Sequence, residues 1–73
     1  MEKTVTGVIE SIDRRPNTRA GNPQYEITLD NGESYLTYPN AGFTYALTGR
    51  EDGKTATLTI GRLARIESIV FHH

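Results

Sequence analysis

The segment from residue 24 to residue 39, QYEITLDNGESYLTYP, constrains the fold more than any other part of this chain. Two runs rich in Tyr, Ile, Leu and Thr flank the dipeptide Asn31-Gly32, the strongest short-range signal for a two-residue hairpin turn. If Asp30 pairs with Glu33 across that turn, one face of the hairpin is apolar and the other is polar. The sequence therefore predicts a β-hairpin whose register is fixed by the polarity of its two faces.

This register assigns each side chain of the hairpin to a face, because directly opposed residues share one face of a sheet. The side chains expected to face the core are Tyr25, Ile27, Leu29, Leu36 and Tyr38. Those expected on the other face are Glu26, Thr28, Tyr35 and Thr37. On this assignment a charge at Leu36 should unfold the protein, whereas a charge at Thr37 should be tolerated.

Residues 3–13 predict a long first strand with one irregularity. The apolar residues of this segment are Val5, Val8 and Ile12. They can all point inward only if one extra residue between Val5 and Val8 reverses the alternation of side chains along the strand. Gly7 is the expected site of that bulge, since glycine in a strand often marks one. Ile9 would then face outward.

The segments on either side of the hairpin predict a loop and a helical turn. Residues 14–23 have no periodicity and are rich in Pro, Gly and Asn, which is typical of a loop. Residues 40–47 could form a helical turn with Asn40 as its N-cap. Phe43 and Leu47, four positions apart, would then close one end of the core.

Residues 54–60 and 63–71 predict the last two strands, from clean alternation in the first and β-branched residues in the second. The chain is then mostly β, with five strands and a short helix between the third and the fourth. This order resembles the OB-fold family across nearly the whole length and implies a small OB-like barrel. An SH3-like barrel is the alternative. The stretch RRPNTRAGNPQYEITLDNG also resembles a pattern in small uncharacterised proteins of actinobacteria and their phages, a resemblance that carries no known activity.

Composition limits what this chain can do. Its 73 residues predict one domain, residues 1–73, and the absence of cysteine excludes disulfides and thiolate metal sites. The only histidines, His72 and His73, are interpreted as a tag remnant or a frayed end rather than metal ligands. With no internal histidine and no apolar run of about 20 residues, we expect a non-enzymatic cytoplasmic protein without a cofactor and without a membrane helix.

The arginines supply the candidate binding site. In an OB-like barrel the loop after the first strand and the turn between the last two strands meet at one end. That end would gather five of the six arginines, with Asp13 as the only acid nearby, and Tyr35 would lie on the outer face as a stacking platform. The predicted nucleic-acid-binding residues are Arg14, Arg15, Arg19, Tyr35, Arg62 and Arg65.

Two functions remain open from the sequence. The first is a binding module that holds single-stranded nucleic acid weakly through the arginines. The second is a small protein-binding barrel that acts as an accessory or inhibitor of a host protein, since such folds serve many unrelated functions. A weak homodimer is also expected through apolar side chains predicted to point outward. These are Ile9, Leu63, Ile69 and Phe71.

Overall fold

The computed structural model describes residues 2–39 and 41–72 and contains five strands and two short 3-10 helices. The strands are β1 (Lys3–Arg15), β2 (Gln24–Leu29), β3 (Ser34–Leu36), β4 (Thr55–Ile60) and β5 (Ile66–His72). The 3-10 helices are η1 (Gly42–Ala46) and η2 (Arg62–Ala64). The expected N-cap Asn40 and the terminal His73 lie outside the described residues. No helix among the described residues is long and apolar enough to cross a membrane.

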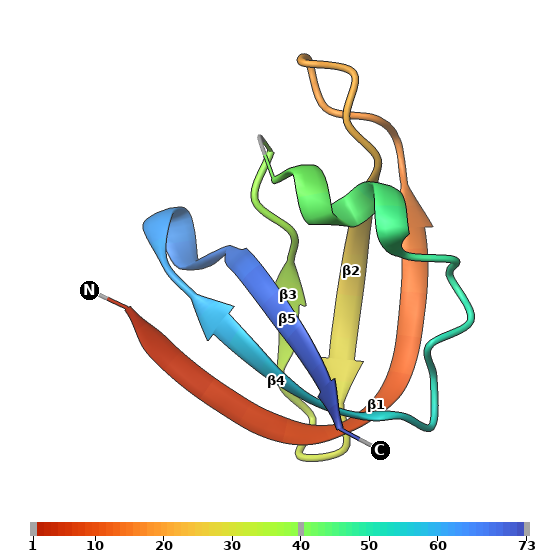
Figure 1. The fold of residues 1–73 in the computed structure, drawn as a ribbon, viewed down its shortest axis with the longest axis vertical. Coiled ribbons are helices and arrows are strands. Elements are labelled where there is room, and N and C mark those ends of the chain that lie inside the picture. The colour runs from red at the N-terminus through yellow and green to blue at the C-terminus, as the bar shows by residue number, and fades with distance from the viewer. Residues whose placement is uncertain (1, 40, 73) are drawn as a thin grey trace.

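All five strands belong to one antiparallel sheet with the order β3-β2-β1-β4-β5, which confirms the mostly-β prediction. The long, curved β1 pairs with β4 through its first half and with β2 through its second half (Figure 1). The sheet is not closed into a barrel by a ladder. Its edge strands meet only at an isolated parallel bridge between Thr37 and Ile66, where Tyr38 N donates to Ile66 O at 2.8 Å.

The bulge in β1 lies at Glu10 and not at Gly7, which corrects the predicted facing of this strand. Ile9 opposes Leu29 and Ser11 opposes Thr28, so Glu10 is the extra residue. Ile9 therefore points inward and is 1% exposed, and Val8 points outward. The irregular spacing of apolar residues did indicate a bulge, but it was placed three residues too early.

The glycine at position 7 is required for a reason other than a bulge. It opposes Ala56 on the inner face, where the β2–β3 hairpin crosses close to β1. A Cβ on Gly7 would lie 3.1 Å from Asp30 Oδ1 and 3.7 Å from Leu29 Cδ1. The glycine thus permits a close approach of two strands rather than a bulge.

The β2–β3 hairpin is shifted by one residue from the predicted register. Leu29 N donates to Glu33 O at 2.8 Å and Gly32 N donates to Leu29 O at 2.9 Å, so the loop contains three residues and not two. Gly32 adopts the left-handed conformation, with φ of 90°, that such a loop requires. Ile27 consequently opposes Tyr35, and Glu26 opposes Leu36.

This shift exchanges the faces of β3 while the faces of β2 stay as predicted. Tyr25, Ile27 and Leu29 are buried as expected. Tyr35 now packs against the core and Thr37 is fully buried, whereas Leu36 lies with Glu26 on the opposite face. The prediction that Leu36 faces the core and Thr37 faces solvent is therefore wrong.

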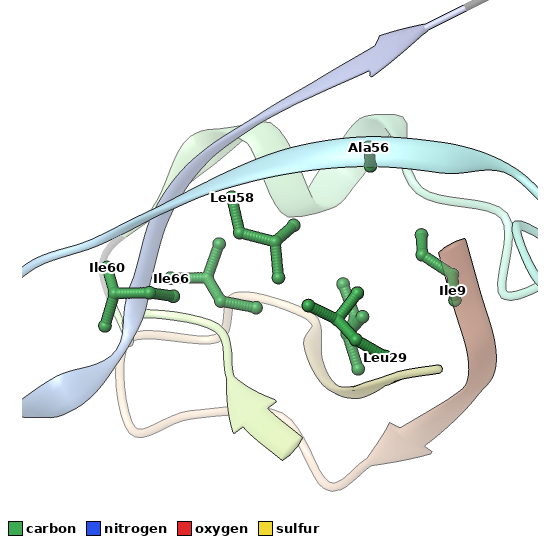
Figure 2. Packing of buried hydrophobic residues seen from close by; sticks show 7 residues of the cluster. Ile9, Leu29, Ala56, Leu58, Ile60 and Ile66 are labelled. Atoms are coloured by element: carbon green, nitrogen blue, oxygen red, sulfur yellow. The ribbon is translucent and has the colours of Figure 1, made fainter. Parts of the chain in front are cut away.

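The core lies between the two halves of the bent sheet, as Figure 2 shows for the side chains that point toward one another from β1, β2, β4 and β5. Its buried cluster consists of Ile9, Ile27, Leu29, Ala56, Leu58, Ile60 and Ile66. Burying each large aliphatic side chain of this kind contributes about 1.5–3 kcal/mol of transfer free energy. Phe43 packs against the cluster and Leu47 is buried, so the predicted helical turn, formed by η1, does cover one end of the core.

A second bulge, at Glu67 in β5, changes the predicted self-association surface. Ile60 opposes Ile66 and Thr59 opposes Ser68, which leaves Glu67 unopposed. Ile69 and Phe71 consequently lie on the inner face and pack against the core. With Ile9 also buried, Leu63 is the only exposed member of the apolar group from which a homodimer was expected.

Candidate functional site

The candidate site is the end of the sheet that carries the loop 16–23 and η2, hereafter the arginine end. Figure 1 shows the loop, η1 and η2 in the half of the molecule opposite to the tip of the β2–β3 hairpin. Five arginines belong to this end. They are Arg14 and Arg15 at the end of β1, Arg19 in the loop, and Arg62 and Arg65 in and after η2.

Gln24, the first residue of β2, joins Arg14 to Arg65. Arg14 Nη1 donates to Gln24 O at 3.3 Å. With its amide oriented so that both polar atoms have partners, Gln24 accepts a hydrogen bond from Arg65 Nη1 at 2.9 Å. Arg65 Nη1 also lies 3.4 Å from Thr37 O. The loop after β1 and the turn before β5 therefore meet, as predicted, across the start of β2.

Arg14 and Arg15 are engaged within the protein. The Arg14 guanidinium lies over the ring of Tyr25, 5.4 Å from its centroid, and donates to Asn17 Oδ1. Arg15 forms a hydrogen-bonded ion pair with Glu26, and this hydrogen bond raises the pKa of the arginine. Glu26 is thus a second acid at this end besides Asp13, which opposes it in the sheet.

The loop that carries Arg19 is held in place by polar contacts. Thr18 Oγ1 and Asn22 Nδ2 both donate to Pro39 O, at 3.1 and 2.9 Å. Gly21 N donates to Thr18 O at 2.9 Å and closes a tight turn with Arg19 at its tip. The exposed side chain of Arg19 forms no hydrogen bond or ion pair with any residue in the described part of the chain.

The turn around η2 carries strained backbone. Leu63 and Ala64 adopt left-handed φ angles of 59° and 55°, which cost about 1–2 kcal/mol each for residues with a Cβ. Arg62 N donates to Glu67 Oε2 at 2.6 Å, so a third acid lies here. The side chain of Arg62 is exposed, as is that of Leu63 at 76%.

Tyr35 does not belong to this site, which corrects its predicted role. Because of the shifted register its ring packs on the core, with Lys3 Nζ 5.6 Å from the ring centroid. Its hydroxyl donates to Glu33 Oε2 at 2.6 Å, which raises the pKa of the phenol. The ring is partly buried on the core side and its hydroxyl is turned toward the acidic hairpin tip, so it does not lie on the outer face as predicted.

The exposed aromatic residue at the arginine end is Tyr45, which the sequence pattern did not single out. Its side chain is 66% exposed, and its hydroxyl lies 3.4 Å from Gly21 O in the loop that carries Arg19. The sequence does contain a signal for the exposure of Tyr45. A helical turn that buries Phe43 and Leu47 must expose a residue between them.

The loop between η1 and β4 contains a buried carboxylate. Glu51 is 4% exposed and accepts hydrogen bonds from Thr48 N, Thr48 Oγ1 and Gly49 N at 2.8–3.0 Å. Burial raises the pKa of this carboxyl, but the hydrogen bonds together outweigh burial and the pKa is lowered. Glu51 thus acts as the cap of its own turn, and this loop also carries the basic Arg50 and Lys54.

Within residues 2–39 and 41–72 the structure has no pocket and no group of three or more acidic, His or Cys side chains placed to hold a metal ion. Comparisons of this chain with protein-family models, with curated proteins and with solved structures found no match. The candidate site therefore stands on the side chains themselves, a set of arginines beside an exposed tyrosine.

Proposed function

We propose that this chain is a non-enzymatic, OB-like binding module that holds single-stranded nucleic acid weakly through the arginine end. The OB-like assignment is supported by the strand order, by η1 between β3 and β4, and by the parallel bridge that brings the sheet edges together at Thr37 and Ile66. A chain with this topology leaves the loop 16–23 and η2 free to contact a ligand.

The observation that carries the proposal is that Arg14, from the end of β1, and Arg65, from the turn before β5, meet at Gln24, the first residue of β2. Arg15, Arg19 and Arg62 belong to the same two segments. Three acids, Asp13, Glu26 and Glu67, lie at the same end, so it keeps a surplus of two positive charges in a chain whose net charge is −1. Arginine suits this role because its planar guanidinium binds phosphate through paired hydrogen bonds.

The arginines contribute in different ways. Arg14, Arg15 and Arg65 hold the loop and the turn in place through internal contacts. Arg19 and Arg62 present exposed guanidinium groups at the tips of the loop and of η2. We assign direct phosphate binding mainly to this pair. The acids nearby make phosphate binding weak, because they reduce the net positive charge of the arginine end.

A fluorescence anisotropy titration with a labelled single-stranded oligonucleotide at low salt tests the proposal. Each phosphate neutralised on a single strand changes the slope of log K against log salt by about −0.7, so two arginines give a slope of about −1.4. Replacing Arg19 and Arg62 with Ala should remove most of the binding and flatten this slope. Arg50→Ala, in the loop between η1 and β4, is the control and should change neither.

The absence of binding up to high micromolar protein would refute the proposal. A loss of affinity per removed charge in Arg50→Ala equal to that in the double variant would also contradict it, because binding would then follow total charge and not the arginine end. Melting temperatures should be unchanged in both variants, since these side chains are exposed and contribute little to the fold.

One observation favours the second function, a protein-binding module that assists or inhibits a host protein. Leu63 is an exposed apolar side chain on a strained turn, and strained backbone with exposed apolar groups occurs at contact surfaces. Leu63→Ser should then abolish capture of that protein from a nuclease-treated lysate. The same variant should leave oligonucleotide affinity unchanged, which separates the two functions.

A further inference from the structure

Tyr45 has the geometry of a stacking platform. Within the described part of the chain it is the only Tyr or Phe with an exposed side chain, and its ring is 66% exposed. Tyr25 is buried beneath Arg14, and Tyr35 is packed on the core. This exposed ring lies beside the loop that carries Arg19, with its hydroxyl 3.4 Å from Gly21 O.

The ring lies beside the loop. The Tyr45 hydroxyl donates to Gly21 O at 3.4 Å, and Gly21 closes the tight turn with Arg19 at its tip. Thr18 and Asn22 tie the same loop to Pro39, which precedes η1 by a few residues. One exposed guanidinium and one exposed ring are thus held on adjacent, mutually anchored segments.

We infer that a base of the bound single strand stacks on the ring of Tyr45 while Arg19 contacts a phosphate of the same strand. This inference rests on the proposed function and adds to it the class of ligand that the site prefers. A platform of this kind needs an unpaired base, so the site prefers single strands to duplexes and to phosphate polymers without bases. It has little base specificity, because every base has a face that can stack.

Tyr45→Ala tests the inference with labelled oligothymidine, oligouridine and an abasic oligomer of the same length. Binding to the first two should weaken by about 5-fold to 150-fold, the equivalent of about 1–3 kcal/mol for one stacked base. Binding to the abasic oligomer should be weaker in the wild-type protein and unchanged by the substitution. Tyr45→Phe keeps the ring and loses only a long hydrogen bond, so its affinity should match that of the wild type.

A second measurement uses the absence of tryptophan from this chain. In Tyr45→Trp the single indole should be quenched when oligothymidine is added and not when the abasic oligomer is added. Val70→Trp, on the exposed face of β5, is the matched control and should remain unquenched.

The outcomes separate the inference from the proposal beneath it. Wild-type affinity in Tyr45→Ala, or equal quenching at Tyr45→Trp and Val70→Trp, overturns the stacking role and leaves binding by the arginines intact. Loss of binding in Tyr45→Phe also overturns it, since the hydroxyl would then be the essential group. Failure of the wild-type protein to bind any oligonucleotide refutes the proposed function and the stacking role together.

Discussion

Thr37→Val is the substitution that most directly tests the hairpin register. Thr37 is fully buried at the end of the β2–β3 hairpin, and its Oγ1 accepts a hydrogen bond from Tyr25 N at 3.2 Å. In a regular antiparallel pair the carbonyl of Thr37 would accept this bond. That carbonyl instead faces Arg65 Nη1, so the side-chain hydroxyl completes the ladder in its place. Valine has the same shape as threonine and cannot accept a hydrogen bond.

The cost follows from the group left without a partner. Removing one partner of a buried hydrogen bond costs about 1–3 kcal/mol, because the Tyr25 N–H would stay buried and unsatisfied. A chain of this size has a total free energy of unfolding of about 4–11 kcal/mol at 0.05–0.15 kcal/mol per residue. For a domain of this size each kcal/mol shifts the melting temperature by about 4–8 °C. We therefore expect a fall of at least a few degrees.

The matched control is Thr28→Val, the same chemical change on the other face of the same hairpin. The Thr28 hydroxyl lies 2.8 Å from Ser34 Oγ in an exposed pair, where water can replace the lost partner, so the change should stay within about 0.5 kcal/mol. Chemical denaturation of both variants gives the difference in unfolding free energy. Amide hydrogen exchange should also show faster exchange at Tyr25 in Thr37→Val alone. Equal stability of the two variants would refute the register, because both hydroxyls would then face solvent.

Two further predictions concern the turns. Glu51→Gln should lower the free energy of unfolding by about 1–3 kcal/mol at neutral pH, because the amide cannot accept all three hydrogen bonds that the carboxylate accepts. Folding lowers the pKa of Glu51 from 4.5, so the carboxylate stabilises the protein above that pH and this stabilisation is lost as the pH falls through the lower folded-state pKa. The unfolding free energies of the wild type and the variant should therefore converge in acid. A difference that stays constant with pH would contradict the assignment. Ala64→Gly should raise the melting temperature by a few degrees, because glycine adopts the left-handed φ of 55° without strain and this gain exceeds the added entropy of the unfolded chain; a fall in the melting temperature would disprove it.

The order of the strands could be predicted because it depends on local patterns, but the start of the last strand and the register of the hairpin could not. The last strand, predicted over residues 63–71, begins at Ile66, because Arg62–Ala64 form η2. Asn31-Gly32 is compatible with a two-residue loop and with a three-residue loop that ends in a left-handed glycine. In the protein, Asn31 Oδ1 accepts a hydrogen bond from Glu33 N at 2.9 Å, which stabilises the longer loop. Because β3 and the two residues after it read Ser-Tyr-Leu-Thr-Tyr, both faces of this segment carry a large side chain, and its own pattern does not select one register.

The two bulges show a similar limit. The sequence of β1 indicates that one extra residue is present, but the position of that residue depends on where β1 changes partner from β4 to β2. The pairing with β4 ends at Val8 and the bulge follows directly at Glu10. A bulge at this point lets one strand bend and serve both halves of the sheet. This is a property of the whole sheet, which no single strand encodes.

The same limit explains why the arginine end could be predicted more fully than its aromatic partner. The arginines belong to the end of β1, to the loop after it and to the turn before β5, so the strand order alone assigns them to one end of the sheet. The choice of tyrosine required the facing of individual residues. A shift of one residue in the hairpin moved Tyr35 from the surface to the core, and the 3-10 geometry of η1 turned Tyr45 outward. The pairing of a ring with Arg19 therefore rests on tertiary contacts, those of Thr18 and Asn22 with Pro39, that anchor the loop beside η1. If Arg19 and Tyr45 form one binding site in this way, that site should be lost when the contact of Thr18 or of Asn22 with Pro39 is removed, even though the side chains of Arg19 and Tyr45 remain.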